Sequence, residues 1–296
     1  MIQVNNLRKA FTDVTAVDGV SFDIRQGETF GLLGPNGAGK TTTIHMLTGV
    51  LRPDAGEINI NGTADPTRLE VRQHLGVAPQ ALALYDELTA EENIAFLAKL
   101  YGLSGPRLKE RVSWALEFAG LSHRRGHRIR TYSGGMKRRL NLACALVHDP
   151  QVVFLDEPTV GVDPQSRNYI FSGIETLARE GRTILYTTHY MEEAQRLCNR
   201  VAIMDRGRIL ALDTVDNLIN QHGGQARVEA ELEGAPPQGV NLPGRSDDGV
   251  LRFASAAPFE EAARLVAAGV KFASFRVDRP NLEVVFLALT GRRLRD

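Results

Sequence analysis

The most chemically specific residues of this chain are 34–41, which match the pattern GxxxxGK[ST] and end on Lys40 and Thr41. They follow the β-rich run 29–33 and precede a helical pattern, so they join a strand to a helix start. Backbone N–H groups at such a start can hold the roughly four negative charges of a triphosphate where glycines allow close approach. The helix start contributes only about 0.3–2 kcal/mol, whereas micromolar binding needs about 8 kcal/mol. The rest must come from Lys40, placed to reach the β- and γ-phosphates, and from Mg²⁺ held by Thr41.

A pair of acidic residues, Asp156 and Glu157, follows the apolar run 152–155. Pro158 comes next, so it should stop the strand and leave both carboxylates exposed at the edge where open α/β sheets bind ligands. Asp156 suits a magnesium contact. Glu157 is placed to polarise an attacking water, because phosphoryl transfer depends mainly on positioning and charge stabilisation. An isolated acidic pair is as often a surface turn, but the phosphate-binding pattern upstream favours catalysis.

One histidine also stands at the end of a β-rich run. His189 follows residues 183–188, where its imidazole could hydrogen-bond the γ-phosphate or orient the water. Taken alone it would be interpreted as a capping or core histidine, and the other six histidines keep that interpretation.

The elements that must position these residues alternate strand and helix over the first 220 residues, which predicts an α/β fold with a parallel sheet. Residues 87–147 show helical periodicity instead, which indicates an inserted helical subdomain. A polar link near 220–224 leads to residues 225–296, with short strand patterns, a helix near 259–268 and a last helix after Pro280. We therefore predict a nucleotide-binding domain over 1–220 and a small α+β domain over 225–296.

Composition excludes several other classes of protein. Lys and Arg total 35, as do Asp and Glu, so the formal net charge is zero and no long-range field favours nucleic acid. Cys144 and Cys198 are expected to be reduced core thiols of a cytoplasmic protein. The apolar runs are shorter than the ~18 residues of a membrane span, and no signal segment is apparent. One basic cluster is interpreted as a solvated face or as potential directed at ATP: Arg124, Arg125, Arg128, Arg130, Lys137, Arg138 and Arg139.

Residues 1–218 resemble the ATPase subunit of an ATP-binding cassette (ABC) transporter. Gln80 is similar to the family's Q-loop glutamine, which also contacts Mg²⁺, Asp156 and Glu157 to its Walker B pair, and His189 to its switch histidine. The remaining matches are the Walker A loop of Gly34, Pro35, Asn36, Gly37, Ala38, Gly39, Lys40, Thr41 and Thr42, the signature of Ser133, Gly134 and Gly135, the D-loop Asp163, and Phe11 in place of the aromatic residue that stacks on adenine. The resemblance implies a P-loop NTPase cassette: a parallel core, an N-terminal antiparallel β part and the inserted helical subdomain.

What the resemblance implies for function is ATP hydrolysis to ADP and phosphate, coupled to transmembrane transport. Two cassettes, identical or paralogous, pack head to tail, so that each Ser133-Gly134-Gly135 helix start faces the γ-phosphate held by the other. A separate membrane permease inserts a coupling helix beside Gln80 and the helical subdomain. It holds the chain, a cytoplasmic protein, at the inner face of the membrane.

The form of the signature resembles one branch of this family. Tyr132 and Met136 replace the usual leucine and glutamine, and the tail 279–291 follows the cassette. Together they look most similar to bacterial exporters of drugs, lipids or lipo-oligosaccharides, although the tail helix could simply pack on its own domain.

Two other functions would require different sequence features. A soluble cassette ATPase acting on ribosomes or nucleic acid should show two P-loops, a long coiled coil or a zinc-bearing insertion, and none is apparent. A non-hydrolysing switch would not need Glu157 and His189, which both look competent.

Overall fold

The computed structural model describes residues 2–63 and 65–292. Outside the described residues lie Met1, residue 64 and residues 293–296. Residues 293–296 belong to the end of the predicted C-terminal domain. The described chain forms two compact units that part between Val215 and Asp216. Each unit is described by itself.

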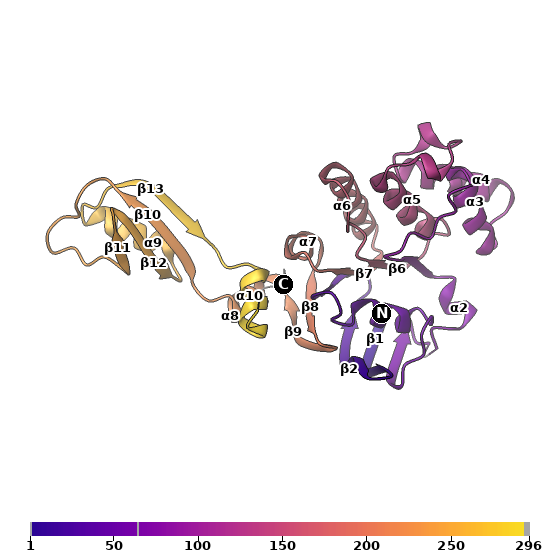
Figure 1. The fold of residues 1–296 in the computed structure, drawn as a ribbon, viewed down its shortest axis with the longest axis horizontal. Coiled ribbons are helices and arrows are strands. Elements are labelled where there is room, and N and C mark those ends of the chain that lie inside the picture. Colours follow the sequence, from indigo (N-terminus) through magenta and orange to yellow (C-terminus); the bar gives the residue numbers. More distant parts are fainter. Residues whose placement is uncertain (1, 64, 293–296) are drawn as a thin grey trace. The chain divides into compact units, whose positions relative to one another are not determined.

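Two sheets build the first unit (Figure 1). A six-stranded sheet has the order β5-β6-β7-β3-β8-β9, in which all neighbours are parallel except the antiparallel pair β8–β9. A three-stranded antiparallel sheet has the order β2-β1-β4. The strands are β1 (Ile2–Phe11), β2 (Val14–Ile24), β3 (Thr29–Leu33), β4 (Ala55–Ile60), β5 (Leu75–Ala78), β6 (Val152–Asp156), β7 (Thr183–Thr188), β8 (Arg200–Asp205) and β9 (Arg208–Thr214). The predicted parallel core and antiparallel N-terminal part are confirmed.

The burial of the strands explains their sequences. Every residue of β3, β6 and β7 is buried, as expected for parallel strands covered on both faces. Along the start of β1 buried and exposed residues alternate, because only one face of that strand meets the core.

Helices cover the larger sheet and form the inserted subdomain. They are α1 (Lys40–Leu47), α2 (Leu69–Arg72), α3 (Ala90–Leu100), α4 (Gly105–Phe118), α5 (Gly134–Leu146), α6 (Pro164–Arg179) and α7 (Met191–Leu197), with short 3-10 turns η1 (Ser122–Arg124) and η2 (Ile129–Thr131). Helices α3, α4 and α5 share a hydrophobic cluster that includes Ile94, Leu116 and Leu140. A capping box of Thr89 and Glu92 fixes the start of α3. None of the helices in the described residues has the length and apolar character that a membrane crossing requires.

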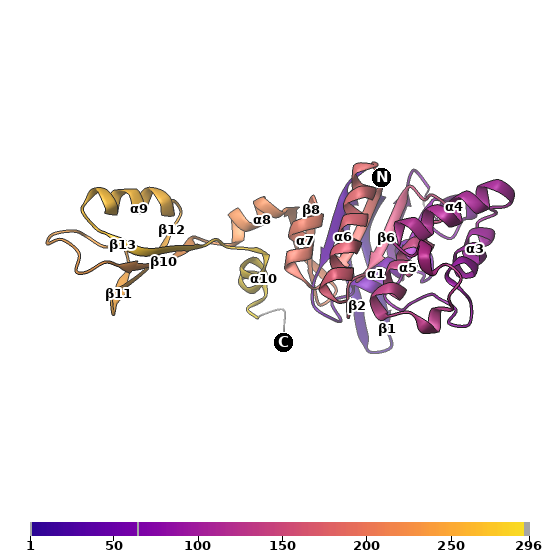
Figure 2. The same ribbon diagram turned by 90° about the horizontal axis from the view of Figure 1, so that it is seen from above.

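The second unit is an antiparallel sheet with a helix on one face (Figure 2). Its strands have the order β11-β12-β10-β13, and α9 packs through Leu265 onto a cluster with Val228 and Leu251. The elements are α8 (Val215–His222), β10 (Ala226–Leu232), β11 (Arg245–Asp247), β12 (Val250–Ser255), α9 (Pro258–Ala267), β13 (Phe272–Asp278) and α10 (Leu282–Thr290). The sequence patterns did not predict α8 or β11.

Candidate functional site

The phosphate loop joins the end of β3 to the start of α1. Gly39 takes a φ of 105° at the helix N-cap, and a Cβ there would collide with the carbonyl oxygen of Ala16 in β2. Only glycine fits such a position. No side chain caps α1, so the N–H groups of its first turn remain available to an anion. The loop therefore fits the phosphate-binding role that its sequence predicts.

The ammonium of Lys40 lies buried against this loop. Its Nζ donates to the carbonyl oxygens of Gly34 at 2.8 Å and Pro35 at 3.0 Å, and it lies 2.9 Å from Glu157 Oε1. Because both members of this ion pair are buried, the cost of removing them from water offsets much of their attraction. A phosphate can thus compete for Lys40 against one carboxylate and two neutral carbonyls.

The two acidic residues after the apolar run are buried, with 2% of Asp156 and 4% of Glu157 exposed. The expectation that Pro158 leaves them exposed is therefore wrong. The physical reason is the neighbouring strand β7: Thr187 Oγ1 donates to Asp156 Oδ1 at 2.7 Å and accepts from the Glu157 N–H at 3.0 Å. The Glu157 backbone has a φ of 45°, a conformation that costs a non-glycine residue about 1–3 kcal/mol. Thr187 holds it there.

The Glu157 carboxylate gathers three of the predicted site residues. Lys40 lies on Oε1, whereas Gln80 Nε2 donates to Oε2 at 3.3 Å and His189 Nδ1 lies 3.3 Å from the same oxygen. The His189 contact lacks hydrogen-bond geometry, so Nδ1 is a buried nitrogen without a hydrogen bond. A base flanked by a cation, an amide and an imidazole with spare hydrogen-bonding capacity can orient and polarise water.

The donors predicted for Mg²⁺ are a hydroxyl on Thr41, an amide on Gln80 and a carboxylate on Asp156. Within the described residues, no group of three or more His, Cys, Asp or Glu side chains could hold a metal by itself. Mg²⁺ usually binds through one or two carboxylates together with substrate phosphates and water. Asp156, with Oδ1 bonded to Thr187, supplies one such carboxylate, so the oxygen donors fit Mg²⁺ held jointly with a phosphate.

The signature residues form the start of α5. The Ser133 hydroxyl accepts from the Met136 N–H at 3.3 Å, and nothing lies within 4 Å of a Cβ placed on Gly134. A Cβ on Gly135 would instead collide with the side chains of Asp163 and Ser166. Asp163 caps α6 by accepting from the Ser166 N–H at 2.9 Å, which lowers the pKa of its carboxyl. The structure thus brings Gly135 next to Asp163. Among the described residues, no hydrogen bond or ion pair links either directly to Lys40 or Glu157.

Phe11 ends β1 with an exposed ring, and Lys9 Nζ lies 5.8 Å from its centroid. The β1–β2 hairpin pairs Phe11 with Val14 and places Ala16 against Gly39 of the phosphate loop. An aromatic face is therefore available on the hairpin that borders the loop.

Two residues near the site were missed by the sequence patterns. Thr187 is inside a β-rich run, and only its place on β7, the strand beside β6, indicates that it belongs to the site. Arg138 was counted in the basic cluster, but it is buried and donates to the carbonyl oxygens of Gln80 at 2.6 Å and of Pro79 and Val160, each at 3.4 Å. The interpretation of a solvated face is wrong for Arg138, which lies on the same side of α5 as the buried Leu142 and Ala145. Other cluster members are paired: Lys137 with Asp86, Arg125 with Glu91 and Arg128 with Glu87.

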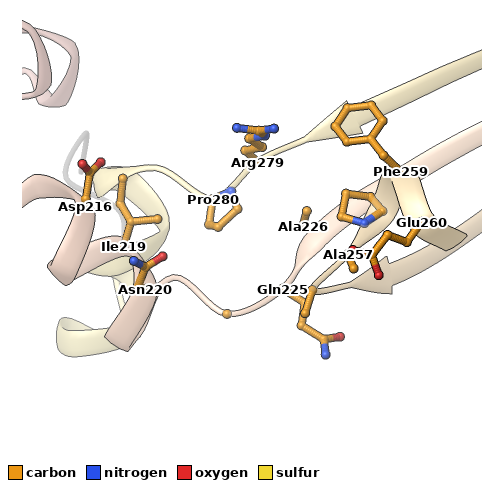
Figure 3. Close-up of a pocket in the computed structure, with 13 residues that line it drawn as sticks. Asp216, Ile219, Asn220, Gln225, Ala226, Ala257, Phe259, Glu260, Arg279 and Pro280 are labelled. Carbon is orange, nitrogen blue, oxygen red and sulfur yellow. The ribbon is translucent and has the colours of Figure 1, made fainter. Parts of the chain in front are cut away.

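A separate cavity of about 840 Å³ lies in the C-terminal unit (Figure 3). Its lining includes Asp216, Glu260 and Arg279, whose guanidinium carbon lies 6.0 Å from the ring centroid of Phe259. None of the predicted site residues lines it.

Comparison with known proteins identifies the fold and the family. The ABC transporter family model matches residues 17–160, a range with the phosphate loop, the signature and both carboxylates. The linearmycin resistance ATP-binding protein LnrL of Bacillus subtilis (strain 168) is 42% identical over 100% of both chains. A Nod factor export ATP-binding protein I of Cupriavidus metallidurans is 40% identical, over 100% of this chain and 99% of that protein.

Solved structures agree with these relatives. An ATP-binding subunit of an ABC transporter has a TM-score of 0.68 and 32% identity, covering 75% of this chain and 93% of its own. A dimeric post-hydrolysis state of the ATP-binding cassette MJ0796, bound to ADP and Pi, has a TM-score of 0.67 and 25% identity, covering 72% of this chain and 98% of its own. The predicted cassette fold is confirmed, and the chain belongs to the ATP-binding proteins of ABC transporters and is an ATPase.

Proposed function

We propose that this chain hydrolyses ATP at the Glu157 carboxylate and drives a separate membrane permease as one of two cassettes. The observation that carries the proposal is the convergence of Lys40, Gln80 and His189 on that one buried group. Residues 34–42 hold the phosphates, with Mg²⁺ on Thr41, Gln80 and Asp156. When bound, Mg²⁺ neutralises charge on the phosphates.

The roles of the protein groups follow from their contacts. Lys40 exchanges its bonds to the Gly34 and Pro35 carbonyls and to Glu157 for phosphate oxygens. Glu157 Oε1 is then able to accept a hydrogen bond from the attacking water. His189 directs its unused nitrogen to the γ-phosphate or to that water. Burial strengthens each of these interactions, because the local dielectric is lower than that of water.

Dimerisation completes the site in this proposal. The Ser133–Gly135 helix start is open at Gly134 and lies beside Asp163, and it has no direct bond to Lys40 or Glu157. A second cassette packed head to tail brings its own phosphates to these donors. Phe11 stacks on adenine. The MJ0796 cassette, which is similar in fold and is dimeric with ADP and Pi bound, supports a dimer of cassettes.

The permease binds next to Gln80 and the helical subdomain. Tyr85 is 54% exposed and Phe96 of α3 is 39% exposed, and their rings meet edge to face at 5.3 Å. Two exposed aromatic rings in contact suit an apolar helix of a partner. The chain then lies in the cytoplasm, on the inner face of the membrane. Residues 1–220 form the cassette and 225–296 an accessory domain of α+β type.

The cargo is proposed from the relatives. Their names specify linearmycin resistance and Nod factor export, which supports export of a drug, lipid or glycolipid. No nucleic-acid partner is proposed.

Co-expression with the permease tests this function. We expect the chain to sediment with membranes only when its permease is co-expressed. The double variant Tyr85→Glu/Phe96→Glu should stay in the soluble fraction, while a control, Leu69→Glu at an exposed apolar residue of α2, should bind like the unaltered chain. Equal binding to plain phospholipid vesicles, or full membrane binding by the double variant, would contradict the proposal.

A further inference from the structure

Another buried carboxylate is bonded to the segments that carry Glu157 and His189. Glu193 of α7 is 3% exposed, and a buried carboxylate is costly unless hydrogen bonds compensate it. Three hydroxyls do so: Thr159 Oγ1 donates to Oε1 at 2.7 Å, while Tyr186 Oη and Thr188 Oγ1 donate to Oε2 at 2.8 and 2.7 Å. A carboxylate can accept all three, whereas an amide of the same size cannot.

Two of these hydroxyls belong to segments that carry the proposed catalytic groups. Thr159 is two residues after Glu157, and Thr188 directly precedes His189. The Thr188 hydroxyl also accepts from the Tyr190 N–H at 2.9 Å, so the backbone is fixed on both sides of His189. In addition, the Thr188 carbonyl accepts from the N–H of Gly34, where the phosphate loop begins, at 3.2 Å.

The third hydroxyl has a different position. Tyr186 is in the middle of β7, where the strand ladder already fixes the backbone through pairing with Gly31 and Leu155. Burial, together with the Glu193 charge, raises the pKa of its phenol well above the usual value, so Tyr186 keeps its proton and donates. It bonds to the same carboxylate and interacts with the Thr159 side chain, but its own backbone is held by the strand ladder and not by Glu193.

We propose that Glu193 is a positioning residue for hydrolysis: it ties the Glu157 segment to the His189 segment and sets the distance between them. The inference rests on the proposed roles of Glu157 and His189. The Glu193 carboxylate is occupied by the three hydroxyls and so acts through the segments that they belong to. It acts through His189, whose Nδ1 lies 3.3 Å from Glu157. Because a misplacement of about 1 Å can cost about 100-fold in rate, loss of this tie should affect the chemical step rather than ATP binding.

Substitutions at the three donors separate positioning from general stability. Thr159→Val and Thr188→Val each remove one hydroxyl from a catalytic segment at nearly constant volume. Tyr186→Phe removes one hydroxyl from the same carboxylate and serves as the matched control. We expect both valine variants to lower kcat by roughly 10-fold or more with little change in KM for ATP, and the phenylalanine variant to stay within about 2-fold. Equal effects of all three on kcat would show that Glu193 is merely structural and would overturn the proposal.

A double-mutant cycle with His189 gives the decisive test on the purified full-length chain. We expect Glu193→Gln to lower kcat about 10- to 100-fold, but to cause less than about 2-fold further loss in the His189→Ala background. If the losses in kcat of the two single variants multiply in the double variant, the role of Glu193 is overturned, while that of His189 is not affected. An unchanged kcat in His189→Ala by itself would instead refute the proposed role of His189, and the role of Glu193 with it. If Glu193→Gln does not fold, Thr188→Val takes its place in the same cycle.

Discussion

Replacing Glu157 with glutamine should separate ATP binding from hydrolysis. The substitution preserves the shape of the side chain and removes the negative charge 2.9 Å from Lys40 Nζ. A positioned base typically contributes about 10²–10⁴ in rate, equal to about 3–5 kcal/mol of barrier. Hydrolysis should therefore slow at least about 100-fold.

The affinity for ATP should not fall with the rate of hydrolysis. In the variant Lys40 keeps its two carbonyl bonds but has no carboxylate to leave when a phosphate approaches. Removing one partner of a buried ion pair costs about 3–5 kcal/mol in the free protein, and a bound phosphate can restore part of this. We expect ATP affinity to be unchanged or to rise by up to about 10-fold. ATP should also raise the Tm of Glu157→Gln more than that of the unaltered chain.

The assay pairs phosphate release with calorimetric ATP binding and thermal melting. Glu110→Gln, at an exposed position of α4, is the control and should match the unaltered chain in all three. Near-normal phosphate release by Glu157→Gln would remove Glu157 from its catalytic role. Loss of ATP binding would instead refute the argument that Lys40 is free to exchange partners.

Three further outcomes are expected. In a mixed dimer, Ser133→Ala on one chain should abolish hydrolysis at the partner's phosphate loop, measured as nucleotide turnover at each loop, and loss confined to its own loop would exclude a composite site. Arg138→Met removes the guanidinium that donates to the Gln80 carbonyl, whereas the Pro79 carbonyl keeps Asn141, so it should cost about 1–3 kcal/mol in unfolding free energy by urea titration; an unaltered midpoint would contradict this. Burial lowers the pKa of His148 to about 4 from its ordinary 6.5, so its stabilising effect is present above pH 6.5 and is lost as the pH falls toward 4. His148→Gln should reduce the acid-induced loss of stability by up to about 3 kcal/mol, measured by urea titration at pH 7 and pH 4.5, and an equal loss in both proteins would contradict the assignment.

The phosphate loop could be predicted because its information is local. Eight consecutive residues fix both the backbone and the position of Lys40, and the apolar runs of β3 and β6 read directly as buried strands. By contrast, β11 has three exposed residues and no apolar alternation, so no pattern marks it.

The errors concern side chains whose surroundings come from distant parts of the chain. Asp156 and Glu157 are covered by Thr187 from a neighbouring strand. The residues at the end of a strand do not indicate which side chain of another strand will cover them. Arg138 sits among six other basic residues, but its guanidinium meets carbonyl groups of the segment around Gln80. Charge alone predicts solvent exposure, whereas the geometry of α5 makes this arginine a link between α5 and the segment around Gln80.

The neighbours of Glu157 are divided between its two carboxylate oxygens, and in the proposed mechanism this division lets one carboxylate serve both binding and hydrolysis. Lys40 lies on Oε1, and Gln80 and His189 lie on Oε2. A phosphate competes most strongly for Lys40, because Lys40 is a cation buried against the phosphate loop. Nucleotide binding thus changes the environment of one oxygen while the other keeps the base oriented. The positive φ of Glu157, held by Thr187, is the backbone conformation that maintains this orientation.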